Sequence, residues 1–117
     1  MLRVLVVEDE ALVALEVADQ LQEAGFRVVG PAASVAKALK LVHDEGCDVA
    51  VLDVNLRDET AEPIARELRF RRTPFLFLSA VSREHLPTEF VDEVLLAKPA
   101  VADVLLVALR KVLENSM

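Results

Sequence analysis

Residues 49–53 read Val-Ala-Val-Leu-Asp, an uninterrupted apolar run that ends in a carboxylate. An apolar run without polar alternation is typical of a strand in a parallel sheet that is covered on both faces. Similar runs, rich in β-branched residues or phenylalanine, occupy residues 2–7, 27–30, 75–78 and 94–97. The sequence therefore predicts five strands, and the short, less apolar run at 27–30 is expected at a sheet edge.

Segments with helical spacing follow these runs, because apolar residues recur three and four positions apart. The predicted helix faces are Ala14, Val17, Ala18 and Leu21; Ala38, Leu41 and Val42; Ala61, Ile64, Ala65 and Leu68; and Val101, Val104, Leu105, Ala108, Leu109 and Val112. Gly25 and Gly46 are suited to end the first two helices, and Ser34 can cap the second. Residues 82–91 contain Pro87 and few apolar residues, which predicts a fourth helix that is short or irregular.

Strand followed by helix, five times over, predicts right-handed crossovers and a doubly wound α/β fold, with helices on both faces of a five-stranded parallel sheet. The length of 117 residues predicts one domain over residues 1–117 and no separate effector domain. In such a sheet ligands bind beyond the carboxyl ends of the strands. The residues at those ends are therefore the candidates for function.

Composition excludes several classes of protein. The longest apolar run, residues 104–109, is far shorter than the ~20 residues that span a bilayer, so no membrane helix is expected. A net charge of −7 argues against binding to nucleic acid. No secretory signal follows Met1, and the lone Cys47 agrees with a reducing compartment, so we expect a cytoplasmic protein.

Polar side chains follow four of the five predicted strands. They are Glu8 and Asp9, Asp53, Ser79 and Lys98. Three carboxylates in one crevice would repel one another by up to ~4 kcal/mol per pair at about 4 Å and an effective dielectric of about 20. A hard divalent ion relieves that repulsion, and Mg²⁺ suits a small open site with one or two carboxylates.

A lysine and a hydroxyl beside such a metal site supply what phosphoryl transfer requires, since catalysis there is mostly positioning and charge stabilisation. Asp53 is the best candidate for the nucleophile, because it stands alone after a central strand whereas Glu8 and Asp9 are adjacent.

At these residues the chain resembles the receiver domains of two-component response regulators, over essentially its whole length. The matching pieces are Val7-Glu8-Asp9-Glu10, Leu52-Asp53-Val54-Asn55-Leu56, Leu78-Ser79-Ala80 and Lys98-Pro99. The resemblance implies a flavodoxin-like sheet with strand order 2-1-3-4-5. It also implies that Glu8, Asp9, Asp53 and the backbone carbonyl of Asn55 hold Mg²⁺. Asp53 would be the phosphoacceptor, Ser79 and Lys98 would bind the phosphoryl group, and the Lys98–Pro99 peptide would be cis.

The resemblance further implies a single-domain response regulator of a bacterial two-component system. A histidine kinase or histidine phosphotransfer protein would phosphorylate Asp53. The product would relay the phosphoryl group or change its binding to a downstream protein. The chain would be a monomer or weak dimer that catalyses its own phosphorylation and dephosphorylation without turnover of an external substrate.

Some positions depart from the receiver pattern. Leu95, three residues before Lys98, stands where receivers usually carry an aromatic residue that swings inward on activation, and Arg57 stands where proline is common. The stretch 53–56 with Pro63, followed by 74–77, resembles the FAT GUY subgroup of stand-alone receivers. In that signature, Ser79, Ala80 and Ser82 replace threonine, glycine and tyrosine.

Other interpretations stay open at this point. Taken singly, Asp9 could cap a helix, Asp53 and Ser79 could be turn residues, and Lys98 could be a solvated cation. A receiver fold could also serve as a phosphorylation-independent protein-binding module. An aspartate-based phosphatase fits less well, because the chain lacks the pair of aspartates at alternate positions after the first strand.

A basic cluster marks the end of the third predicted helix. It consists of Arg66, Arg69, Arg71 and Arg72. Cations there favour the helix dipole, and the alternative is a patch that docks a partner.

Overall fold

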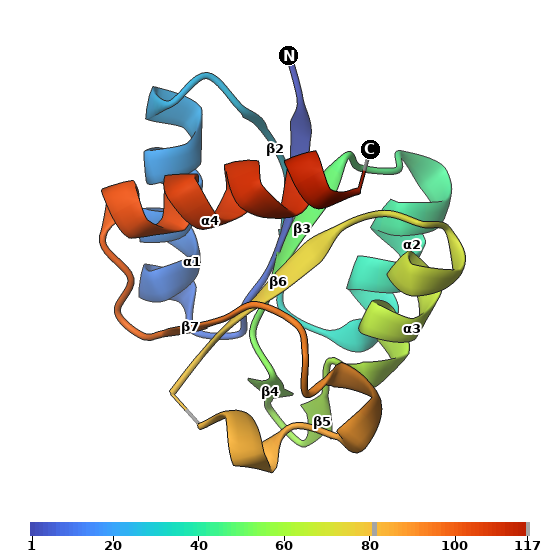
Figure 1. The fold of residues 1–117 in the computed structure, drawn as a ribbon. Coiled ribbons are helices and arrows are strands. Elements are labelled where there is room, and N and C mark those ends of the chain that lie inside the picture. The colour runs from blue at the N-terminus through green and yellow to red at the C-terminus, as the bar shows by residue number, and fades with distance from the viewer. Residues whose placement is uncertain (81, 117) are drawn as a thin grey trace.

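The computed structural model describes residues 1–80 and 82–116. Its central sheet is parallel and contains β1 (Arg3–Val7), β2 (Arg27–Ala32), β3 (Val49–Leu52), β6 (Phe75–Ser79) and β7 (Leu95–Ala97) in the order β2-β1-β3-β6-β7 (Figure 1). Counted over the five predicted strands, this order is 2-1-3-4-5. The predicted doubly wound α/β fold is therefore confirmed, with the second strand at an edge as expected.

The sheet is covered on both faces. α1 (Ala11–Glu23) and α4 (Ala102–Asn115) lie on one face, and α2 (Val35–Asp44) and α3 (Glu62–Phe70) lie on the other (Figure 1). Two apolar clusters correspond to these layers, one containing Leu21 and Leu109 and the other Val42 and Leu68. Every residue of β3 and β6 is buried, which explains why these strands lack polar alternation.

The helix boundaries follow the predicted signals. The Ser34 side chain accepts a hydrogen bond from the backbone N–H of Lys37 at 3.2 Å and so caps α2. Gly25 and Gly46 follow α1 and α2 with φ of +94° and +74°, a left-handed conformation that glycine adopts without a steric penalty.

One strand and one helix differ from the prediction. β2 continues past Gly30 to Ala32, because an edge strand tolerates Pro31, whose nitrogen has no hydrogen to donate. In α4 the buried stripe is Leu105, Ala108, Leu109 and Val112, whereas Val101 and Val104 are exposed. Val101 precedes the helix, and Val104 is turned about 100° from Leu105 around the helix axis.

Between β6 and β7 the described residues form two 3-10 turns, η1 (Arg83–His85) and η2 (Thr88–Phe90), in place of an α-helix. The irregularity predicted for this segment is confirmed.

A short antiparallel hairpin, β4 (Asn55–Leu56) and β5 (Glu59–Thr60), was not predicted; Asp58 at its turn has a φ of 62°. No helix in the described ranges is long and apolar enough to cross a membrane.

Candidate functional site

Backbone hydrogen bonds of the parallel sheet fix the residues at the strand ends. Glu8 donates its N–H to the carbonyl of Ala32, and Asp53 donates to the carbonyl of Val7, both at 2.9 Å. Lys98 donates to the carbonyl of Ser79 at 3.0 Å. The backbone at Glu8, Asp53 and Lys98 is therefore held by a neighbouring strand of the sheet rather than by a free loop.

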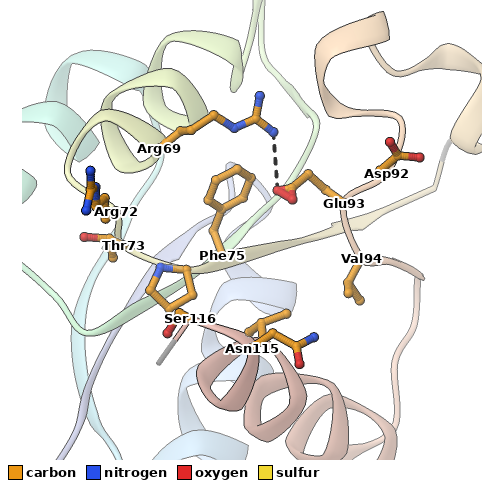
Figure 2. Close-up of a pocket in the computed structure, with 11 residues that line it drawn as sticks. Arg69, Arg72, Thr73, Phe75, Asp92, Glu93, Val94, Asn115 and Ser116 are labelled. Carbon is orange, nitrogen blue, oxygen red and sulfur yellow. Dashed lines mark ion pairs between the residues drawn. The ribbon is translucent and has the colours of Figure 1, made fainter.

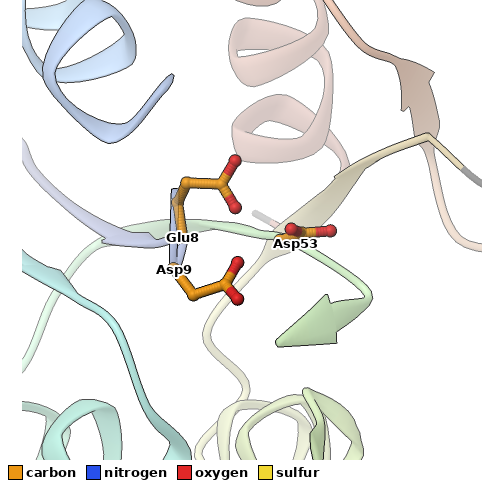
Figure 3. Close-up of side chains that lie close together, drawn as sticks. All are labelled: Glu8, Asp9 and Asp53. Carbon is orange, nitrogen blue, oxygen red and sulfur yellow. The ribbon is translucent and has the colours of Figure 1, made fainter. Parts of the chain in front are cut away.

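Three carboxylates converge at this edge of the sheet. Glu8, Asp9 and Asp53 point toward one another and each offers one oxygen within 4.8 Å of the others (Figure 3). Glu8 and Asp53 are only 5% and 6% exposed, so water screens their charges poorly. The arrangement requires a positive counter-charge.

Lys98 supplies part of that charge. Its ammonium donates to Asp53 Oδ2 at 2.9 Å and to Glu8 Oε1, and the Glu10 carboxylate lies 3.7 Å away. The Lys98–Pro99 peptide is cis, as the resemblance implied. Lys98 thus bridges the buried acids at the ends of the first and third predicted strands.

The titration of these groups reflects their burial. The pKa of Glu8 is raised to about 7: burial is the largest cause, the neighbouring Asp53 carboxylate adds to the rise, and Lys98 opposes it. Burial disfavours the ammonium of Lys98, but its hydrogen bonds to Glu8 and Asp53 outweigh burial, so the pKa of Lys98 is raised. One lysine does not neutralise the acidic cluster.

A divalent cation fits this cluster. Glu8 Oε2 is buried and has no hydrogen-bond partner among the described residues, although a buried carboxylate oxygen normally has one. Carboxylate oxygens are the ligands that Mg²⁺ prefers. Glu8, Asp9 and Asp53 would therefore hold the ion, and it would satisfy the unpartnered oxygen.

The remaining predicted residues line the same crevice, whose volume is about 230 Å³. Its walls include Asp9, Asp53, Asn55, Ser79 and Lys98. Ser79 is buried at the end of β6, and the Asn55 N–H donates to Asp53 Oδ1 at 3.3 Å. The structure thus brings all six predicted site residues together.

The capping interpretation of Asp9 does not match the structure. Glu10 occupies the N-cap position of α1, and no side chain caps it there. Glu10 itself approaches Lys98, a contact that was not predicted. The signal was present as three consecutive acidic residues, 8–10, after the first strand.

A larger cavity, about 330 Å³, lies at the opposite ends of β6 and β7 (Figure 2). Its walls carry both signs of charge, from Arg69, Arg72, Asp92 and Glu93. None of the six predicted site residues reaches it, so the crevice at the carboxyl ends is the candidate site.

This fold with this crevice defines the class of receiver domains. The family model described as "Response regulator receiver domain" matches residues 4–110, and the chain belongs to that family.

Individual relatives agree with the family. The chain is 38% identical to SdrG from Sphingomonas melonis Fr1, with a TM-score of 0.85 over 97% of both chains. A structure of SdrG in its BeF3-activated conformation gives a TM-score of 0.80 at 38% identity over 95% of both chains. The transcriptional regulatory protein PdtaR of Mycobacterium tuberculosis is 33% identical over 72% of this chain, which spans 42% of that protein. The chain thus spans less than half of this curated relative.

Proposed function

We propose that this chain is a response regulator that accepts a phosphoryl group on Asp53 in a Mg²⁺-dependent reaction. The observation that carries the proposal is the cluster of the Glu8, Asp9 and Asp53 carboxylates, of which Glu8 and Asp53 pair with the Lys98 ammonium. The phosphoryl donor is a histidine kinase or a histidine phosphotransfer protein, and the transfer takes place in the cytoplasm. The product either binds a partner protein differently or passes the phosphoryl group on.

The reaction transfers the phosphoryl group from nitrogen to oxygen. A carboxylate oxygen of Asp53 attacks the phosphorus of a phosphohistidine, and an O–P bond forms as the P–N bond breaks. The imidazole nitrogen leaves with the electron pair and takes up a proton. Asp53 attacks as the carboxylate, and the Lys98 ammonium lies 2.9 Å from its Oδ2.

The chain's own residues position and stabilise the transferred group. Lys98 lies 2.9 Å from Asp53 Oδ2, where its charge can pair with a phosphoryl oxygen once the group is attached. Ser79 ends β6 in the same crevice and would donate its hydroxyl hydrogen to another oxygen. Bound Mg²⁺ would supply further positive charge, held by Glu8, Asp9, Asp53 and the Asn55 carbonyl.

Mass spectrometry of the intact protein tests this proposal. Incubation with Mg²⁺ and acetyl phosphate should add one phosphoryl group, and chelation of the metal should prevent it. Asp53→Ala should abolish the adduct, whereas the exposed Asp103→Ala should leave it intact. Failure to form an adduct with acetyl phosphate, phosphoramidate and a panel of histidine kinases would overturn the proposal.

A second function is favoured by one observation, the packing of Leu95 against the core where receivers usually place a switch aromatic. In this alternative the fold binds a protein partner regardless of phosphorylation. The two functions separate on the partner affinity of Asp53→Ala measured with and without phosphodonor. If the unaltered protein and Asp53→Ala bind the partner with equal affinity, with phosphodonor and without it, the alternative is favoured.

A further inference from the structure

The hairpin that follows Asp53 is too small to hold its own position. β4 and β5 pair two residues each, Asn55 with Thr60 and Leu56 with Glu59, beyond the carboxyl end of β3 (Figure 1). A two-stranded hairpin is at best marginally stable in water. Leu56 is buried in the core, whereas both residues of β5 are exposed. The position of β5 therefore depends on contacts outside the hairpin.

Glu59 makes such a contact, with the first residue of α2. Its Oε2 accepts a hydrogen bond from the backbone N–H of Val35 at 2.9 Å. The first N–H groups of a helix have no partner within the helix, and the positive end of the helix dipole favours a carboxylate there. The first turn of α2, residues 35–38, contributes no acidic residue of its own. Glu59 thus caps α2 from 24 residues away, while Ser34 caps the N–H of Lys37.

This hydrogen bond links the segments that carry the acidic cluster. Glu8 donates its N–H to Ala32 at the end of β2, three residues before α2 begins. Asp53 donates its N–H to the last residue of β1. The bond from Val35 to Glu59 joins α2 to the hairpin after Asp53. Three hydrogen bonds of 2.9 Å therefore connect the ends of β1, β2 and β3 in a closed circuit, and only the third of them uses a side chain.

The hairpin also forms part of the crevice wall. Asn55 and Leu56 line the crevice together with Asp9 and Asp53. The Asn55 N–H donates to Asp53 Oδ1 at 3.3 Å, so a displacement of β4 changes the surroundings of Asp53. A hairpin that leaves α2 withdraws Asn55 from the metal site. The apparent Mg²⁺ affinity then falls in proportion to the fraction of molecules in which the hairpin is in place.

We propose that Glu59 is a positioning residue for the metal site: by accepting the Val35 N–H, it holds the hairpin where Mg²⁺ binding requires it. The inference rests on the proposed function. Glu59 acts through Asn55 and Asp53, and it makes the N-terminus of α2 part of the support of the crevice. Because coupling between two sites is reciprocal, Mg²⁺ binding must in turn strengthen the contact between the hairpin and α2.

The Mg²⁺ affinities of two Glu59 variants test this inference. Glu59→Ala removes both the acceptor and the charge. Its dissociation constant, measured by calorimetric titration, should rise by about threefold to tenfold, the range that the net contribution of one hydrogen bond allows. Glu59→Gln removes the charge but keeps an accepting oxygen, so its dissociation constant should stay within about twofold of that of the unaltered protein. Equal losses in both variants would show an effect of charge alone and overturn the positioning role, as would an unchanged affinity in Glu59→Ala.

A double-mutant cycle tests the same hydrogen bond from the side of α2. Val35→Pro removes the donor at the first position of a helix, where proline is well tolerated, and the preceding Ser34 is already extended at φ −142° and ψ 161°. Val35→Pro should weaken Mg²⁺ binding, and adding Glu59→Ala should weaken it no further. The lost packing of the valine is common to both proline variants and cancels in the cycle. Additive losses, with the fold confirmed by circular dichroism, would overturn the pairing. If Val35→Pro does not fold, the comparison of the two Glu59 variants decides.

Hydrogen exchange separates this inference from the proposed function. In the unaltered protein, saturating Mg²⁺ should slow exchange of the Val35 amide by about threefold or more, as followed by NMR, and in Glu59→Ala it should not. Mg²⁺ binding without a change at Val35 would overturn the role of Glu59 and leave the proposed function intact. Absence of Mg²⁺ binding to the unaltered protein, together with absence of a phosphoryl adduct, would overturn both.

Discussion

The Lys98 ammonium and the Asp53 carboxylate lie 2.9 Å apart, although 45 residues separate them in the chain. The contact joins the ends of β7 and β3, which are separated by β6 in the sheet. A side chain that pairs with the nucleophile before reaction can pair with the transferred group after it. This relationship makes Lys98 the most informative residue to change.

Replacing Lys98 should slow phosphorylation far more than it disturbs the fold. In Lys98→Gln the developing charge on the phosphoryl oxygens loses the ammonium that lies beside Asp53, and we expect the rate of adduct formation to fall by about 100-fold. Intact-mass kinetics with acetyl phosphate and saturating Mg²⁺ would measure it. Lys111→Gln, an exposed change on α4, is the control and should react at the original rate. Comparable rates for both variants would remove Lys98 from the mechanism.

Asp9 should contribute to metal binding. Asp9→Asn removes one of three clustered carboxylates, so the dissociation constant for Mg²⁺ should rise by about tenfold or more. Calorimetric titration would measure the affinity, with Asp19→Asn on the outer side of α1 as the matched control. Without metal, Asp9→Asn should not lower the unfolding free energy, because it relieves repulsion with Glu8 and Asp53. An unchanged Mg²⁺ affinity would place the ion elsewhere.

The strands and their terminal residues could be predicted because both signals are local. An apolar run such as residues 49–52 indicates a buried strand, and Asp53 is read directly after it. Parallel pairing then brings separate strand ends to one edge, so the site residues could be placed together before any distance was known.

The side-chain contacts between α3 and residues 82–93 could not be predicted in the same way. Arg66 and Glu89 are 23 residues apart and show no periodic relationship, so their pairing depends on how the chain returns over α3. Phe90 was one of a few scattered apolar residues in 82–91, yet it is the side chain that anchors them. The β4–β5 hairpin likewise has strands of two residues, too short for any alternation to be recognised.

Gly30 should tolerate substitution poorly. Its φ is +91°, and an added Cβ would lie 2.8 Å from the Ala32 nitrogen and 3.2 Å from the Val6 carbonyl oxygen. Gly30→Ala should lower the unfolding free energy by about 2 kcal/mol or more, from backbone strain plus overpacking. Gly25→Ala has a similar φ but no atom within 4 Å, so about 1 kcal/mol is expected. Urea unfolding followed by circular dichroism would compare them; equal losses would show that the close contacts near Gly30 relax without cost.

Cys47 should react slowly in the folded protein, with a distinctive pH dependence. Burial raises the pKa of its thiol from 9.0 to about 11, which lowers the thiolate fraction at pH 8 by about 100-fold relative to an ordinary cysteine. The folded-state pKa exceeds the unfolded one, so the stability linked to the neutral thiol is present below pH 9 and is lost as the pH rises toward 11.

The raised pKa of Cys47 also sets the pH dependence of its alkylation. The rate with iodoacetamide, followed by mass spectrometry, should rise by about tenfold per pH unit from 8 to 10 in the native protein. In denaturant the same reaction should be fast at pH 8 and level off above pH 9. A native rate that also levels off near pH 9 would show that the thiol is not shielded by its packing against the core.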